Sequence, residues 1–125
     1  MGRGRKYTGN AGERIAASYL KEKGYRVLER NYRTIFGEID IVARLGAMIV
    51  FVEVKTRATS SLGPPYLSVT GIKQAHMIKN ALFYLKTHKL TDANWRIDIV
   101  SVRMDHAHRV ESVELIENAV EHDYI

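Results

Sequence analysis

Residues 37–57 contain two mostly apolar runs, a pattern that predicts two β-strands joined by a short turn. The two apolar runs are separated by Gly46, a residue type that tight hairpin turns favour. Both strands contain acids among residues expected to be buried. Asp40 stands between two isoleucines and Glu53 between two valines, and Lys55 follows two positions later. Because a buried carboxylate is costly unless it is paired or binds a metal, this hairpin is the first candidate for a functional site.

The register of the hairpin decides whether its charged side chains meet. Side chains alternate along a strand, so a loop of two or four residues places Asp40, Glu53 and Lys55 on one face of the sheet. A two-residue loop at Leu45-Gly46 makes Asp40 a diagonal neighbour of Glu53, roughly 7–8 Å away at the backbone. A three-residue loop would send Asp40 to the opposite face, and the two acids could not share a ligand.

The segments around the hairpin predict two helices and three further strands. Gly24 is placed to end the first helix, which Thr8 or Asn10 could cap. The second helix carries apolar residues at steps of three and four, so an inward stripe is expected at Ile72, Ala75, Ile78, Leu82 and Leu85. The order of elements predicts an α/β fold with a mixed central sheet and helices on its faces. The expected ranges are helix 10–23, strand 25–30, hairpin 37–55, loop 56–66, helix 69–89, strand 95–104 and edge strand 109–116.

Length and composition are those of one globular domain. The 125 residues are 46% hydrophobic and 26% charged, and residues 9–125 are expected to fold as a single unit after a flexible basic tail at 1–8. No apolar run is long enough to span a membrane, and the N-terminus lacks the apolar segment of a secretory signal. The absence of cysteine excludes disulfides and thiolate zinc sites, and a cytoplasmic location is expected.

The charge balance favours a polyanionic partner. Nineteen Lys and Arg against 14 Asp and Glu give a formal net charge of +5, which points to nucleic acid first and an acidic membrane surface second. A basic protein without such a partner is the alternative. The candidate phosphate contacts, each of which could equally belong to a solvated basic face, are Arg57, Lys73, Lys79, Arg3, Arg5 and Lys6.

The acids of the hairpin suggest a hard cation. Oxygen ligands in a chain without cysteine favour Mg²⁺ or Mn²⁺ over zinc. Lys55 could then hold an attacking water or neutralise charge that develops on a phosphate. The alternative is a buried ion pair in which Lys55 only neutralises Glu53 or Asp40.

Two acids outside the hairpin need separate consideration. Glu13 shares the helix face of Ala16 and Ala17, so its carboxylate is expected to point toward the sheet, although an exposed acid that favours the helix dipole is the alternative. Asp98 lies in a later apolar strand, where it is expected to pair with Arg96 or to cap a neighbour, with a role as a third ligand as the alternative.

The spacing of Asp40 and Glu53-Val54-Lys55 resembles the signature of the PD-(D/E)xK nuclease superfamily, which has the restriction-endonuclease-like fold. Ile39 stands where a proline usually precedes the aspartate. Over nearly its full length the chain resembles the uncharacterised YraN-like bacterial family, most specifically in Gly37–Asp40 and Phe51–Arg57. That family is similar in fold to archaeal Holliday-junction resolvases.

The resemblance implies a fold, a site and a reaction. The implied core is helix-strand-strand-strand-helix-strand, and the implied catalytic residues are Glu13, Asp40, Glu53 and Lys55. Asp40, Glu53 and Glu13 would bind Mg²⁺ or Mn²⁺, and the carbonyl of Val54 could add a ligand. The expected function is a metal-dependent endonuclease that acts on DNA rather than RNA, with branched or repair intermediates as candidate substrates.

Two other functions remain open from the sequence. One is a nucleic-acid-binding module that keeps the nuclease fold but does not cut, and the other is a structural protein whose acids only form ion pairs. A homodimer would be expected if the protein makes paired cuts, and the edge strand near 110–115 or the helices could supply its interface.

Overall fold

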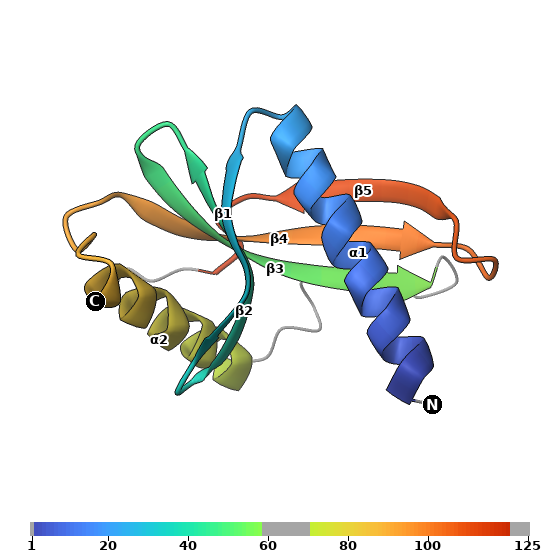
Figure 1. Cartoon of the computed structure of the whole chain (residues 1–125), viewed down its shortest axis with the longest axis horizontal. Helices are drawn as coiled ribbons and strands as arrows, with labels where there is room; N and C mark the ends of the chain where they lie inside the picture. Colours follow the sequence, from blue (N-terminus) through green and yellow to red (C-terminus); the bar gives the residue numbers. More distant parts are fainter. Residues whose placement is uncertain (1, 59–70, 121–125) are drawn as a thin grey trace.

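The computed structural model describes residues 2–58 and 71–120. Its strands form one five-stranded sheet in the order β1-β2-β3-β4-β5, with α1 crossing one face and α2 lying on the other (Figure 1). Neighbouring strands are antiparallel except β3 and β4, which are parallel because α2 makes the crossover between them. The mixed α/β fold predicted from the sequence is confirmed. The elements are α1 (Gly2–Glu22), β1 (Arg26–Thr34), β2 (Gly37–Leu45), β3 (Met48–Ala58), α2 (Gly71–Thr87), β4 (Trp95–Met104) and β5 (Val110–Ile116).

The alternation along β3 divides the interior into two cores. Even-numbered residues such as Val52 pack beneath α1 with Leu20, whereas odd-numbered residues such as Phe51 pack beneath α2 with Tyr84. Every odd-numbered position farther along β3 therefore faces the α2 side of the sheet.

The loop between β2 and β3 has the even length that the candidate site requires. It consists of Gly46-Ala47, one position later than the expected Leu45-Gly46, so the predicted position is wrong and the predicted parity is confirmed. Gly46 has φ 61° at the first of the two loop positions, where a type II′ turn places glycine. One further step of this ladder would set Asp40 directly opposite Glu53 rather than diagonal to it.

The buried face of α2 differs from the predicted stripe. Ile72 is 74% exposed and Leu82 is 36% exposed, because aromatic packing fixes the rotation of the helix instead. Tyr84 meets the rings of Phe51 and Tyr32 edge to face, with centroids 5.6 and 5.0 Å away. The buried residues of the helix are Ile78, Asn80, Ala81, Tyr84 and Leu85.

Some element boundaries also differ from the expectation. The helical backbone of α1 begins at Gly2 and so includes the segment expected to be a flexible tail. β1 continues to Thr34, where connecting chain was expected, while β4 matches the predicted strand residue for residue. β3 extends to Ala58, and the rest of the predicted loop lies outside the described residues. In the described part of the chain, neither helix has the length and apolarity that crossing a bilayer demands.

Candidate functional site: an acidic fork in the sheet

The sheet forks where β2 leaves β3. The two strands pair only as far as Ile41 and Val52, and β2 then continues to Gly37 paired with β1 alone. The backbone of Val54, two residues past the last pair, faces the gap. The Asp40 side chain lies in this gap, and its Oδ2 accepts a hydrogen bond of 2.8 Å from the Val54 N–H. A carboxylate thus takes the position that a strand carbonyl would otherwise hold.

Three carboxylates converge at the fork. Glu13, Glu38 and Asp40 each offer an oxygen, and these oxygens all lie within 4.8 Å of one another. Glu13 reaches the fork from α1 and is only 8% exposed, so its predicted inward orientation is confirmed. Arg30 of β1 pairs weakly with Glu13, with its Nη2 4.0 Å from Oε2, and the exposed Arg33 pairs with Glu38, with its Nε 3.7 Å from Oε2.

Gly12 explains how α1 brings Glu13 so close to the sheet. A Cβ on Gly12 would lie 2.0 Å from Oγ1 and 3.2 Å from Cβ of Thr56 on β3. Only glycine permits this approach, and the neighbouring Glu13 is thereby held at the fork.

Substitution of Gly12 by alanine is expected to push α1 away from β3. The overpacking should lower the free energy of unfolding by about 1–3 kcal/mol, even though alanine is the better helix former. Gly71→Ala is the matched control, because nothing lies within 4 Å of the added Cβ, and it should leave stability unchanged or raised. Urea denaturation measures both, and Thr56→Ala should recover part of the loss in Gly12→Ala. An unchanged midpoint for Gly12→Ala would contradict the close contact.

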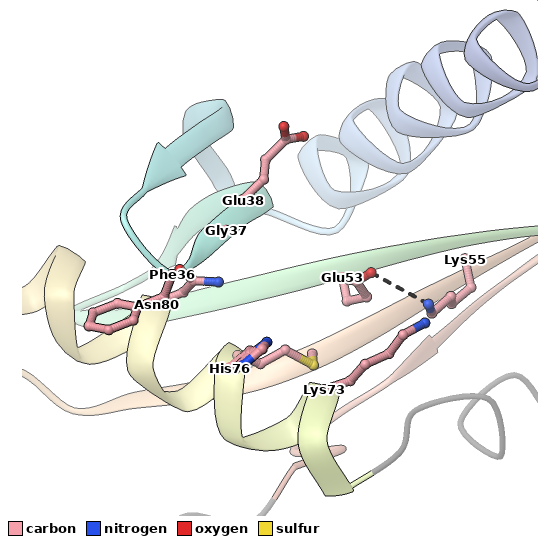
Figure 2. A pocket seen from close by; sticks show the side chains of 9 residues that line it. Phe36, Gly37, Glu38, Glu53, Lys55, Lys73, His76 and Asn80 are labelled. Atoms are coloured by element: carbon pink, nitrogen blue, oxygen red, sulfur yellow. Dashed lines mark ion pairs between the residues drawn. The ribbon is translucent and has the colours of Figure 1, made fainter. Parts of the chain in front are cut away.

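Glu53 and Lys55 lie beside the fork on the α2 side of β3. Lys55 Nζ is 3.5 Å from Glu53 Oε1, and Figure 2 shows Lys73 of α2 directed toward this pair. They border a cavity of about 220 Å³ between the sheet and α2. Its lining residues are Phe36, Gly37, Glu38, Glu53, Lys55, Lys73, His76, Met77 and Asn80.

The carboxylates at the fork repel one another, and burial together with this repulsion changes their pKa values. Burial raises the pKa of Asp40 to about 7, and the charge of Glu53 adds to the rise. The Val54 N–H opposes it, while Glu13 and Glu38 contribute further. Burial also raises the pKa of Glu53 against the opposing charge of Lys55.

The structure thus brings the predicted site residues into one neighbourhood, with one addition. Glu38 joins Glu13 and Asp40 in the closest group, whereas Glu53 is linked to Asp40 through its charge. The sequence contained a signal for Glu38, since it stands two positions before Asp40 on the same strand. Because the N–H and C=O of one residue point to the same strand edge, the Val54 carbonyl also faces the fork. The assignment of metal ligands stays a prediction.

The residues predicted to contact phosphates lie at different distances from the site cavity. Lys73 lines the cavity, and Lys79 lies farther along α2 with its Nζ 5.8 Å from the centroid of the Phe36 ring. Arg57 follows Lys55 by two positions on β3. The side chains of Arg3, Arg5 and Lys6 lie outside the described part of the chain.

Asp98 is separate from the fork. Its Oδ1 accepts hydrogen bonds from Arg96 Nε at 2.9 Å and from the Asn118 N–H at 2.8 Å. The predicted pairing with Arg96 is confirmed, and Asp98 contributes no oxygen to the acidic group.

The sheet, its two helices and the fork define an α/β protein with a carboxylate-lined site. Within that class, the chain belongs to the family described as "Uncharacterised protein family UPF0102", whose profile matches residues 12–102. This is the YraN-like family indicated by the sequence.

Relatives match along most of their length. A "UPF0102 protein" of Syntrophus aciditrophicus (strain SB) is 50% identical over 119 residues, which cover 94% of this chain and 91% of that protein. A "UPF0102 protein" of Moorella thermoacetica is 45% identical over 115 residues, covering 92% and 96%. Among solved structures, Pyrococcus furiosus SfsA in complex with Ca²⁺ is similar with a TM-score of 0.42 and 16% identity, over 94% of this chain and 65% of that one.

Proposed function

We propose that the protein is a metal-dependent nuclease that hydrolyses phosphodiester bonds in DNA. The observation that carries the proposal is the group of three carboxylates, from α1 and β2, with oxygens within 4.8 Å of one another at a break in the sheet. A fold rarely retains such a group for stability alone, because Glu13 is buried, Asp40 is half-buried, and each of the three charges raises the cost of ionising the others.

The donor set fits a hard divalent cation. Carboxylate oxygens are the ligands that Mg²⁺ and Mn²⁺ prefer, and no softer donor joins the group. Glu13, Glu38 and Asp40 would hold the ion, with Glu53 and the Val54 carbonyl as nearby candidates. When bound, the ion would supply Lewis-acid polarisation of a phosphate and a bound water of lowered pKa.

The remaining residues have roles that follow from their positions. Lys55 would leave its pairing with Glu53 to orient the attacking water or to neutralise charge on the phosphate. Lys73, directed at the same pair, would bind an adjacent phosphate without reading sequence (Figure 2). These assignments place the scissile bond at the mouth of the cavity that Glu38 and Glu53 line.

The test is cleavage of end-labelled DNA by the purified chain. The panel contains blunt duplex, single strand, a duplex with a single-stranded extension, a fork and a four-way junction, each in Mg²⁺, in Mn²⁺ and in EDTA. We expect cleavage of at least one form in a divalent metal and none in EDTA. No cleavage of any form, nor of matched RNA, overturns the proposal.

Divalent metal should also stabilise the folded chain. A ligand that binds only the native state adds about 2.7 kcal/mol at a hundredfold excess over its Kd, so Mn²⁺ or Mg²⁺ should raise the melting temperature measurably. Glu13→Gln should reduce this shift, because it removes a charged donor at the fork. Glu22→Gln, an exposed position at the end of the same helix, should retain it. Equal shifts for the wild type and both variants would place the ion elsewhere.

One alternative is favoured by a specific observation. The helix α2 carries Lys73, Lys79 and Lys86 and no acidic residue, as expected of a surface that binds nucleic acid whether or not it is cut. Salt-dependent DNA binding that survives Asp40→Ala, in a chain that cuts nothing, would select a binding module over a nuclease.

A further inference from the structure

A second hollow adjoins the acidic site. It has a volume of about 320 Å³ and lies between the β1–β2 turn and α2. Two apolar side chains of the turn are exposed there, Ile35 at 80% and Phe36 at 39%. Phe36 also lines the cavity at the fork, at the end away from Lys55 and Lys73 in Figure 2, so its side chain borders both hollows. The full lining is Ile35, Phe36, Lys79, Leu82, Phe83 and Lys86.

The turn is fixed against α2. Asn80 of α2 is only 4% exposed, and its Oδ1 accepts a hydrogen bond from the Thr34 hydroxyl. The same Thr34 Oγ1 accepts the Phe36 N–H at 2.9 Å. The Phe36 ring then meets Phe83 edge to face, with centroids 6.2 Å apart. Because these contacts hold the turn from both its backbone and its ring, the groove is formed before any ligand arrives.

The rim of the groove is cationic. Lys79 Nζ is 5.8 Å from the centre of the Phe36 ring, and Lys86 borders the same hollow two turns farther along α2. With Lys73 at the site cavity, these lysines follow α2 over 13 residues, about 20 Å along the helix. An apolar floor bordered by lysines is the combination that proteins use to bind unpaired nucleotides.

Resting on the proposed nuclease function, we propose that this groove holds an unpaired nucleobase of the strand whose phosphodiester lies at the acidic fork. The base would lie against Ile35 and Phe36, and its neighbouring phosphates would bind Lys79 and Lys86. The substrate class is then nucleic acid with a single-stranded segment beside the cleaved bond. Intact duplex keeps the faces of its bases stacked inside the helix, so none of them could lie against the exposed apolar side chains.

A second copy of the chain fits this surface poorly. A two-fold interface brings the same patch of both copies together, so the lysine-bordered groove would face a second cationic patch. A polyanionic partner complements these lysines instead.

The test is a binding experiment in EDTA, where cleavage plays no part. Fluorescence anisotropy compares a labelled duplex that carries a single-stranded extension with the blunt duplex of the same length. We expect the wild type to prefer the extension. Phe36→Ala or Ile35→Ser should lower affinity for the extended form by about tenfold, with less than about a twofold change for blunt duplex. Val110→Ser is the matched control, because it replaces an exposed apolar residue (45%) on the far strand β5 and should change neither affinity.

The outcomes separate this inference from the proposed nuclease. If the chain cuts DNA but Phe36→Ala and Ile35→Ser bind both forms as the wild type does, the groove holds no base and the inference fails. If the preference depends on Phe36 in a chain that never cuts, the groove stands and the nuclease proposal fails. If the two variants shift the sedimentation coefficient of the free protein and leave DNA affinity unchanged, the surface joins two copies and the inference is overturned.

Discussion

Replacing Asp40 by asparagine is expected to abolish metal-dependent cleavage and to raise the melting temperature at neutral pH in the same protein. The loss of activity should be at least about a hundredfold, because a charged donor leaves the centre of the acidic group. The fold should tolerate the change, because the asparagine Oδ1 can still accept the Val54 N–H. Initial rates on the best substrate of the panel measure the first effect.

The stabilisation follows from linkage. The pKa of Asp40 is about 7 in the folded chain against 3.8 for an unperturbed aspartate, so between these values the folded state binds more protons than the unfolded state. Stability therefore falls as pH rises through that window, and the loss is complete above about pH 7. The acids that act on Asp40 are Glu13 of α1, Glu38 of β2 and Glu53 of β3. The cations paired with these acids are Arg30, Arg33 and Lys55.

The variant escapes this loss because asparagine does not ionise. Its melting temperature in EDTA should match the wild type near pH 4 and exceed it by about 5 °C or more at pH 8, for a gain of about 1–3 kcal/mol. Asp105→Asn is the control, because the pKa of Asp105 is shifted in the opposite direction to that of Asp40. The backbone N–H of Arg109 lowers the pKa of Asp105, so losing that charge should bring no gain at pH 8. If the difference in melting temperature between Asp40→Asn and the wild type does not vary with pH, the pKa of Asp40 in the folded chain is that of an ordinary aspartate.

Replacing Asp98 by alanine is expected to cause the largest loss of stability, about 3–5 kcal/mol, out of a total of about 5–15 kcal/mol for a domain. Asp98 is fully buried and accepts hydrogen bonds from Arg96 and from the Asn118 backbone. Alanine would leave the Arg96 Nε–H and the Asn118 N–H without their buried acceptor, and the guanidinium would keep Glu117, whose Oε1 is 3.7 Å from Nη2, as a more distant charge partner. Arg96 also donates to the Tyr25 hydroxyl at 2.8 Å, so any shift of Arg96 would weaken the link between β4 and the segment that joins α1 to β1.

Urea denaturation measures this effect. Asp92→Ala, at an exposed loop position, should stay within about 0.5 kcal/mol of the wild type. The double change Arg96→Met with Asp98→Leu should recover much of the loss, because a packed apolar pair leaves no buried charge without a partner. A cost below about 1 kcal/mol for Asp98→Ala would mean that water replaces the carboxylate.

The parts of the site that depend on alternation were predictable from the sequence. The even loop and the inward face of Glu13 follow from periods of two and 3.6, which local sequence encodes. The resemblance to a known family supplied Glu13, Asp40, Glu53 and Lys55 as a set.

The fork itself was not predictable. Pairing rules give the register of two strands but not the residue at which they separate, so the hydrogen bond from Val54 to Asp40 had no signal in the sequence. The predicted rotation of α2 was wrong for a related reason. Apolar residues occur on more than one side of that helix, so their spacing alone does not show which side is buried. The aromatic contacts of Tyr84 with strands distant in sequence decide which of them are buried.

The bond that closes the fork gives this protein an internal spectroscopic label. The Val54 N–H points at Asp40, whose pKa of about 7 makes its charge vary near neutral pH, and no substrate is needed to observe it. In a ¹⁵N-labelled sample the Val54 amide resonance should follow the protonation of Asp40 through a pH titration, and should move again when a cation displaces that proton. A single peak in a two-dimensional spectrum would then report whether the Asp40 carboxylate is protonated, free or bound to a cation, before any activity assay is run.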